Sequence, residues 1–238
     1  MTNEKYIEQN RYFNYRNVEP TLYDNVVLPA WIKSEIDDHN ANILDYGCGF
    51  GQLMQALLNE KYMNVFGLDI EKSAISHCHS KNLNVMELDL NELHNPFNIK
   101  FDVIIFSHVI EHMPKEKIIK KLEFIKNTFL SENGKFLIAV PNAQANTDAY
   151  WAYEDWTHTT LFTSGSIYYV LKAAGFNNVE FLDIDCTLGI RSKLKKLIVK
   201  FLLKIYICKK IFWNKVTNSP YHKPSPQIFS YEIKCKAY

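Results

Sequence analysis

The sequence predicts an α/β fold built on a mostly parallel sheet, and three observations support this prediction. Short β-rich runs alternate with helix-compatible segments between residues 42 and 142. A glycine-rich turn follows the first run and opens directly into a helix-compatible segment. Acidic residues stand where the first two runs end. Because the carboxyl ends of parallel strands share one edge of a sheet, we expect a ligand site at that edge.

The glycine-rich turn places Asp45 before alternating glycines at Gly47, Gly49 and Gly51. Glycine permits positive φ and removes the Cβ that would keep a ligand from the backbone, while the first turn of the next helix offers free N–H groups. Such a loop suits a nucleoside-bearing ligand. The dinucleotide fingerprint G-x-G-x-x-G would need its third glycine where this chain has Gln52, which counts against NAD.

This acid–glycine pattern resembles the first motif of the class I S-adenosylmethionine (SAM) dependent methyltransferases, in which the acid helps hold the methionine end of the cofactor, directly or through water. The string F-D-V-I-x-x-x-H-V-I-E-H at residues 101–112 is similar to the fourth motif of methyltransferases that modify small metabolites, quinones and glycans. The resemblance covers about residues 40–185. It implies a Rossmann-like sheet of seven mostly parallel strands, with helices on both faces and the last strand antiparallel.

The order of the elements follows from the β-rich and helix-compatible segments. We expect residues 1–40 to form an arm and a helix, helical at 21–38, that cover the cofactor cleft, and residues 41–238 to form the methyltransferase domain. After the first strand, further strands are expected at residues 64–70, 84–90, 101–107, 135–142, 179–185 and 226–236. Helices are expected at residues 52–58, 71–81, 115–130 and 166–174, and a turn at residues 132–134.

The cofactor residues are predicted partly from position and partly from the resemblance. Asp69 ends the second strand, where an acid can accept hydrogen bonds from two ribose hydroxyls. The resemblance implies that Asp89 accepts a hydrogen bond from the adenine amino group and that Leu90 packs on the ring, although Asp89 can instead cap a helix at residues 91–93. The full set expected to bind SAM is Asp45, Gly47, Cys48, Gly49, Gly51, Asp69, Ile70, Asp89, Leu90, Ser107 and His108.

The segment at residues 143–162 is too polar and aromatic for a core element. Long loops in compact domains are usually functional or disordered, and disordered segments are poor in aromatic residues, so we expect an acceptor site here. The string D-W-T-H…F-T-S is similar to a stretch of methyltransferases found among surface-polysaccharide enzymes. The acceptor residues expected are Tyr150, Trp151, Tyr153 and Trp156, whose aromatic faces can pack against sugar rings.

The resemblance therefore implies O-methylation of a carbohydrate or an associated group, such as a sugar hydroxyl, a phosphate or a phosphoramidate-type precursor, in capsule or lipopolysaccharide biosynthesis. Three alternatives stay open. One is a quinone or other small-molecule O- or N-methyltransferase, another is an RNA 2′-O-methyltransferase, and the third is a non-catalytic nucleotide-binding module.

An alcohol hydroxyl is a poor nucleophile near neutral pH, so its methylation benefits from a general base. We predict His158 as that base, oriented by Asp155, and expect His112 mainly to pin the loop after the fourth strand. An alternative is a divalent ion held by His108, Glu111, His112 and His158. Some O-methyltransferases carry E-x-x-E-H at this place, and because a histidine replaces the first glutamate here, softer ions are favoured over Mg²⁺.

Composition and charge set further bounds. The 238 residues, 47% of them hydrophobic, suffice for one sizeable α/β domain. Five scattered cysteines without a C-x-x-C pair predict reduced thiols, and the polar N-terminus lacks the apolar core of a signal peptide, so we expect a cytoplasmic protein. The net charge of +1 hides an asymmetry, because residues 186–231 hold ten Lys/Arg and no acid.

Those basic residues concentrate in a predicted amphipathic helix at residues 190–213, inside an insertion at 190–215. Lysines interrupt every apolar run, so the segment is too polar to span a bilayer. It can dock on its own domain, on a partner in a homodimer, or on an anionic membrane at the inner face, and nucleic acid is the least favoured partner. The other partner expected is a small-molecule or glycan acceptor.

Overall fold

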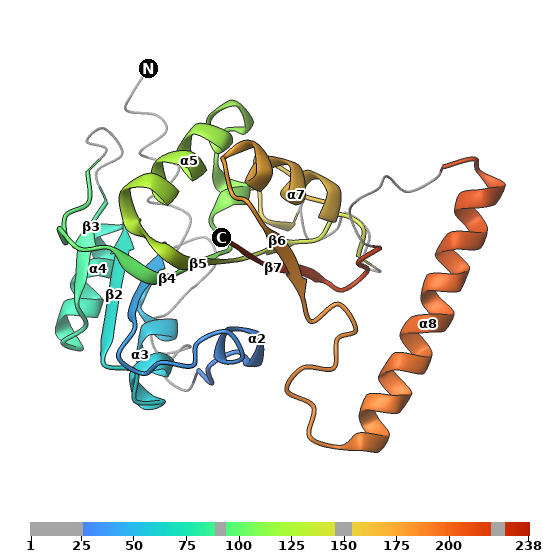
Figure 1. The fold of residues 1–238 in the computed structure, drawn as a ribbon, viewed down its shortest axis with the longest axis horizontal. Helices are drawn as coiled ribbons and strands as arrows, with labels where there is room; N and C mark the ends of the chain where they lie inside the picture. The colour runs from blue at the N-terminus through green and yellow to red at the C-terminus, as the bar shows by residue number, and fades with distance from the viewer. Residues whose placement is uncertain (1–25, 89–93, 146–153, 220–226) are drawn as a thin grey trace.

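The computed structural model describes residues 26–88, 94–145, 154–219 and 227–238, and these form a seven-stranded sheet in the order β3-β2-β1-β4-β5-β7-β6 (Figure 1). Strand β7 runs antiparallel to both of its neighbours, and the other pairings are parallel. The predicted Rossmann-like fold is therefore confirmed. The strands are β1 (Asn42–Tyr46), β2 (Asn64–Asp69), β3 (Val85–Glu87), β4 (Phe101–Ser107), β5 (Leu130–Pro141), β6 (Val179–Leu182) and β7 (Glu232–Ala237).

Helices cover both faces of this sheet, with α5 and α7 on one side and α2 and α3 on the other (Figure 1). Their bounds are α2 (Ala30–Lys33), α3 (Gln52–Asn59), α4 (Lys72–Ser80), η2 (Ile110–His112), η3 (Lys115–Lys117), α5 (Ile118–Phe129), α7 (Ser164–Ala173) and α8 (Lys193–Val216). Strand β4 shows why two cores form. Ile104 and Phe106 point into the core beneath α5 and α7, whereas Val103 and Ile105 point into the core beneath α2 and α3.

The helix expected at residues 21–38 is shorter in the described part of the chain. Only Ala30–Lys33 is helical there, and Pro29 occupies the position before the first helical residue. Proline lacks an N–H and disfavours helical geometry in the residue that precedes it, so the helix begins after Pro29. Residues 1–25 lie outside the described residues, as does the arm expected to cover the cleft.

The turn expected at residues 132–134 lies instead inside β5. The β4–β5 register shifts between the pairs Phe101↔Leu130 and Val103↔Lys135, so the intervening residues of β5 bulge opposite Asp102. A bulge and a turn both favour Asn and Gly, which explains the wrong prediction.

The last strand also begins later than expected, at Glu232. The residues just before Glu232 are not paired as a strand. The Asn142 side-chain amide donates hydrogen bonds to the carbonyls of Ile228 and Ser230 and holds them in place.

Helix α8 stands beside the sheet and away from the rest of the molecule (Figure 1). All of its 24 residues are described, and none is buried. None of the helices among the described residues combines the length and the apolar content needed to cross a bilayer.

Candidate functional site

The glycine-rich turn follows β1, and two of its glycines differ in the space around them. Gly51 has a φ of 77° and stands immediately before α3, and a Cβ there would lie 2.4 Å from Leu83 Cδ1. A side chain at Gly51 would therefore force the side chains of Leu83 and Cys78 to shift. Gly49 also has a positive φ, but a Cβ there would meet nothing closer than Gln52 Oε1 at 3.8 Å. The backbone at Gly49 is thus open to an incoming group, as a ligand-cradling loop requires.

Asp69, at the end of β2, holds the loop in place. Its Oδ2 accepts a hydrogen bond from the Gly49 N–H at 2.7 Å, and its Oδ1 accepts one from the Glu71 N–H at 2.9 Å. Burial raises the pKa of Asp69, whereas these backbone hydrogen bonds lower it. Each carboxylate oxygen has a second lone pair, so the predicted acceptance of ribose hydroxyls is compatible with these bonds.

Asp45, the acid of the predicted motif, is buried on β1 directly before the turn. Burial, and secondarily the nearby charge of Asp69, raises the pKa of Asp45 to about 7. The carboxyl therefore changes charge in the neutral range. A cationic group brought against it, such as the ammonium of a methionine moiety, would favour its ionised form.

A cavity of about 460 Å³ lies at this edge of the sheet, where the predicted residues Asp45, Gly47, Cys48, Ser107 and His108 all line it. They come from the carboxyl ends of β1 and β4 and from the glycine turn. The structure thus brings together residues of the first and fourth motifs, as a shared ligand site requires. The other predicted cofactor residues in the described part of the chain, Gly49, Gly51, Asp69 and Ile70, do not line this cavity. Asp89 and Leu90 lie outside the described residues.

The same cavity has a charged wall that was not predicted, formed by Asp183, Glu232 and Lys234. Lys234 Nζ lies 3.4 Å from Asp183 Oδ2 and 3.7 Å from Glu232 Oε2. Because β7 is antiparallel, its first residues reach the edge where the parallel strands end. The expected antiparallel direction of the last strand could have predicted this charged wall, because it places the start of that strand, and not its end, in the site.

His108 joins the two parts of the site. Its backbone φ is 55°, in the left-handed region that residues other than glycine rarely adopt. Its Nε2 lies 2.9 Å from Glu232 Oε1 and its Nδ1 lies 3.2 Å from Glu111 Oε1. Burial of the ring lowers its pKa, but the hydrogen bonds and charges of the two glutamates outweigh this and raise the pKa of His108 to about 10. His108 is therefore an imidazolium that donates from both ring nitrogens at neutral pH.

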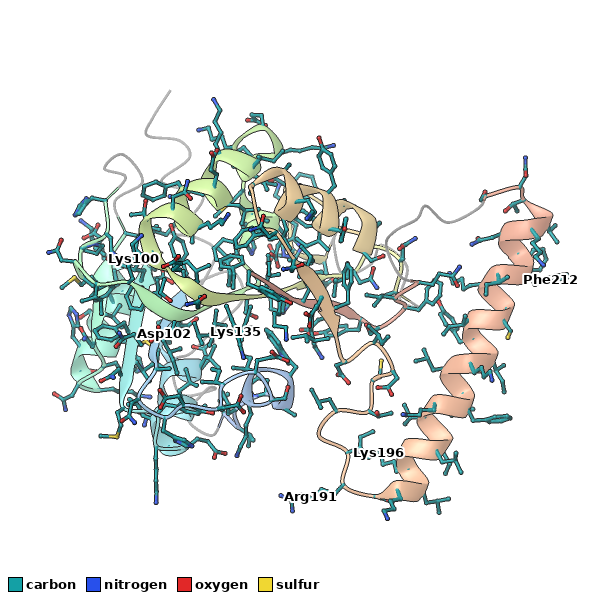
Figure 2. All side chains as sticks on the ribbon, in the orientation of Figure 1. Lys100, Asp102, Lys135, Arg191, Lys196 and Phe212 are labelled. Atoms are coloured by element: carbon teal, nitrogen blue, oxygen red, sulfur yellow. The ribbon has the colours of Figure 1, made fainter. Side chains whose placement is uncertain are left out.

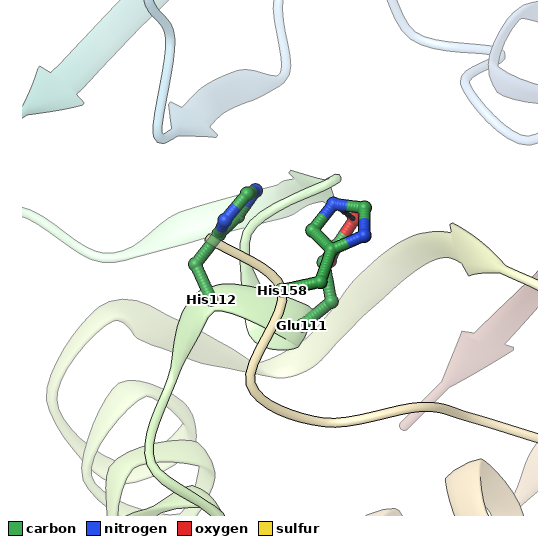
Figure 3. A group of neighbouring side chains, drawn as sticks. All are labelled: Glu111, His112 and His158. Atoms are coloured by element: carbon green, nitrogen blue, oxygen red, sulfur yellow. Dashed lines mark ion pairs between the residues drawn. The ribbon is translucent and has the colours of Figure 1, made fainter. Parts of the chain in front are cut away.

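Beyond His108 lies a cluster of Glu111, His112 and His158, in which one ligand atom from each residue lies within 4.8 Å of the others (Figure 3). The His112 and His158 rings approach edge-on with centroids 4.8 Å apart. His158 Nε2 lies 4.0 Å from Glu111 Oε1 and 3.8 Å from Asp155 Oδ2. Glu111 is only 1% exposed, and its Oε2 has no hydrogen-bond partner among the described residues.

Backbone hydrogen bonds bring these distant residues together. The N–H groups of Thr159 and Thr160 donate to the Glu111 carbonyl at 2.8 and 3.1 Å, and the Thr159 hydroxyl donates to the Met113 carbonyl at 2.6 Å. The segment that carries His158 is thereby fastened to η2. The structure thus places His158 beside the loop after β4.

Asp155 lies beside His158 and is also linked to His112 through Thr157. The Thr157 hydroxyl donates to Asp155 Oδ1 at 2.7 Å and lies 2.9 Å from His112 Nδ1. A hydroxyl has one proton, so when it donates to Asp155 it must accept from His112 Nδ1–H. The Asp155–Thr157 pair thus fixes the tautomer of His112, and the lone pair is on Nε2.

The metal alternative can be tested against this geometry. One carboxylate and two imidazoles suit a borderline divalent ion with open positions for an acceptor. Glu111, His112 and His158 fit that description, whereas His108, the fourth ligand expected, does not. Both of its nitrogens donate to carboxylates, and a protonated imidazole has no lone pair for a metal.

The acceptor residues expected in the aromatic segment are only partly described. Trp156 is 92% exposed, so its ring is available to a large acceptor. Tyr150, Trp151 and Tyr153 lie outside the described residues.

Comparisons with solved structures identify the fold. A SAM-dependent methyltransferase from Archaeoglobus fulgidus has a TM-score of 0.56 at 19% identity, over 83% of this chain and 86% of that chain. One from Mesorhizobium loti also has a TM-score of 0.56, at 16% identity, over 87% of this chain and 94% of that chain. The magnesium protoporphyrin IX methyltransferase from Synechocystis PCC 6803, solved with S-adenosylhomocysteine, has a TM-score of 0.52 at 15% identity, over 92% and 82%.

At these identities the structural likeness establishes the fold alone, and no curated protein matches the sequence. The family is established by the sequence itself. Residues 12–181, more than half of the chain, match the family described as "Methyltransferase domain". The chain therefore belongs to the methyltransferase domain family and is an enzyme with the fold of the SAM-dependent methyltransferases.

Proposed function

We propose that this enzyme uses SAM to methylate an oxygen of a carbohydrate or an associated group in surface-polysaccharide biosynthesis. The donor occupies the cavity against the glycine turn. Asp45 holds the methionine end of the donor and Asp69 its ribose. The observation that carries O-methylation is the Glu111–His112–His158 cluster, since an oxygen acceptor is the kind that needs a positioned base.

SAM supplies a methyl group on a positively charged sulfur, so the chain's own task is to align the acceptor and take its proton. The acceptor oxygen forms the new C–O bond as the C–S bond breaks, and the electron pair of that bond neutralises the sulfonium. The acceptor proton goes to an imidazole of the cluster.

Two imidazoles compete for that proton. His158, the base expected from the sequence, has a side chain that is 7% exposed and an Nε2 close to two carboxylates. His112 is in the same partly exposed class as His158, and its Nδ1–H hydrogen bond to Thr157 puts the lone pair of the neutral ring on Nε2. The hydrogen bonds thus favour His112 as the base, with His158 beside it to share the proton and position the ring. A divalent ion on the same three residues is the second candidate, because the buried Glu111 Oε2 is the kind of ligand it would take.

The carbohydrate class is supported by the aromatic segment and by the exposed ring of Trp156. A direct test incubates the enzyme with SAM and three acceptor panels: lipid- or nucleotide-linked glycan precursors, quinone precursors, and short RNAs. We expect a product mass increase of one CH₂ and matching S-adenosylhomocysteine only in the glycan panel. A product only in another panel would overturn the acceptor class and leave methyl transfer intact. Titration calorimetry showing no binding of SAM would overturn the cofactor assignment as well.

A substitution at Trp156 tests the acceptor site in the same assay. Trp156→Ala removes an exposed ring and should raise KM for a glycan acceptor with little change in SAM affinity. Tyr169→Ala, which removes a ring that is 66% exposed on α7, is the matched control. Equal effects of the two variants on KM would remove Trp156 from the acceptor site.

A further inference from the structure

Helix α8 presents its apolar face away from the protein. Leu194, Ile198, Phe201, Ile205, Phe212 and Val216 recur three, four or seven residues apart, so they share one face of the helix, and each is between 48% and 67% exposed. The residues that are partly covered fall on the opposite side of the helix: Lys196, Val199, Leu203, Tyr206, Ile207, Lys210, Ile211 and Asn214. Figure 2 shows the same division, with Phe212 on the outer side of α8 and Lys196 on the side nearer the protein.

A surface helix usually packs its apolar face on the core and leaves polar residues in water, whereas α8 leaves this apolar face in water as well. Two contacts join α8 to other described residues. On the inner face Tyr206 packs edge-on against Phe229, with ring centroids 5.6 Å apart. Beside the inner face, Lys200 Nζ pairs with Asp185 Oδ2 at 2.9 Å. An exposed apolar face of this length indicates a surface that contacts another phase or molecule.

The charges flanking that face indicate what it contacts. Helix α8 carries eight lysines and no acidic residue. At 100° per residue, Lys193, Lys204 and Lys215 lie along one edge of the apolar face and Lys195 and Lys209 along the other. An apolar strip between two rows of lysines is the arrangement by which a helix lies in the interface of an anionic bilayer.

A second copy of the chain fits these charges less well. Two α8 helices packed through their apolar faces would bring the flanking lysines of both copies together, with no acid on either helix to pair with them. An anionic surface supplies the missing charge instead. Because α8 is too polar to cross a bilayer, it must lie along the surface.

We propose that α8 is an interfacial anchor that docks the enzyme on anionic lipid. The anchor also bears on the cavity, because the segment that joins β6 to α8 contributes Asp183 and Leu188 to the cavity lining. Docking α8 would therefore hold the cavity close to a lipid-linked acceptor. Membrane binding by α8 does not depend on the identity of that acceptor.

Co-sedimentation of the full chain with vesicles tests the anchor. We expect binding to vesicles that contain phosphatidylglycerol, little binding to phosphatidylcholine alone, and a loss of binding as salt rises from about 0.01 M to about 0.5 M. Absence of binding to the anionic vesicles at low salt would overturn the proposal, and so would equal binding to both vesicle types.

Matched variants separate the anchor from general surface effects. Leu194→Asp and Met63→Asp each place a charge at a position that is 67% exposed, the first on α8 and the second before β2. Only the α8 variant should lose binding. Lys204→Glu with Lys209→Glu should weaken it roughly tenfold or more, whereas the exposed Lys117→Glu should change it little. Equal losses in the α8 variants and their controls would contradict the assignment.

Light scattering without lipid tests whether a second copy of the chain covers the apolar face of α8 instead. We expect a monomer whose mass is the same for the parent chain and for Leu194→Asp. A dimer that this substitution dissociates, together with no lipid binding by the parent, would show that a second copy covers α8 and would overturn the membrane anchor.

Discussion

The two halves of the site differ in how they are built. The cofactor half, with Asp45 and Asp69, comes from β1, β2 and the turn between β1 and α3, all within a single short stretch of sequence. The acceptor half depends on residues that are far apart in the chain, such as Glu111 and His158. His108, which lines the cavity, joins the two halves and pairs with Glu232, 124 residues away. The cofactor half uses a local motif, while the acceptor half is assembled by tertiary packing. The two halves should therefore respond to different substitutions.

The largest effect is expected in the acceptor half. His112→Ala should lower kcat by roughly 10²- to 10⁴-fold while the Kd for SAM stays within about twofold, because a base acts on the acceptor and not on the donor. Steady-state kinetics and titration calorimetry measure the two quantities. His39→Gln, an exposed histidine distant in sequence, is the control.

His158→Ala sharpens that result. If His158 alone takes the proton, its variant should lose as much activity as His112→Ala, and the hydrogen bond from His112 to Thr157 would then be structural. Full activity in both variants would leave alignment and desolvation as the whole mechanism.

The next largest effect lies in the cofactor half. Asp69→Ala removes the acceptor for the Gly49 N–H and for the ribose, and one lost charged hydrogen bond costs about 1.5 to 3 kcal/mol, so SAM affinity should fall by roughly ten- to a hundredfold. The exposed Asp38→Ala is the control for loss of a carboxylate. A folded Asp69→Ala protein that binds SAM as tightly as the parent would contradict the site assignment.

A smaller, pH-dependent effect is expected at Asp45. Burial raises its pKa to about 7, and the ionised carboxylate is the form that holds a cation. SAM affinity should therefore rise between about pH 5.5 and about pH 7.5, several-fold in total. Titration calorimetry across that range measures the rise, and Asp45→Asn should abolish it. A parent affinity that does not change with pH would exclude Asp45 from cofactor binding.

His108 should couple pH to stability. Its folded-state pKa is raised, so the stability that its two glutamates give is fully present below about pH 6.5, the ordinary pKa, and is lost as pH rises through about 10. Urea unfolding at both pH values should show a larger drop in the free energy of unfolding for the parent than for His108→Gln. Identical drops would mean that the His108 charge contributes nothing.

The smallest effect is expected from chelation. We expect a chelator to leave activity within about twofold, because an imidazole base needs no ion. Abolished activity that an added divalent ion restores would replace the base with a metal on Glu111, His112 and His158. Substitution of any one of those three residues would then remove the ion response.

Helices α5 and α8 show what the sequence determined alone and what it left to packing. Both carry apolar residues at helical spacing with lysines between them, so periodicity predicted both helices. In α5 the residues Ile118, Leu122 and Ile125 are buried, whereas in α8 the corresponding face is open to solvent. Periodicity defines which residues share a face, but whether anything covers that face depends on distant segments.

The same division holds for the site. The sequence determined the α/β class, the glycine turn and the acids at the strand ends, because each follows from residues close together in the chain. Only the tertiary structure decided that the antiparallel β7 brings Glu232 to His108 and that Thr157 links Asp155 to His112. Such contacts depend on strand direction and on where a returning segment is hydrogen-bonded. Side-chain spacing along the chain contains no information about either.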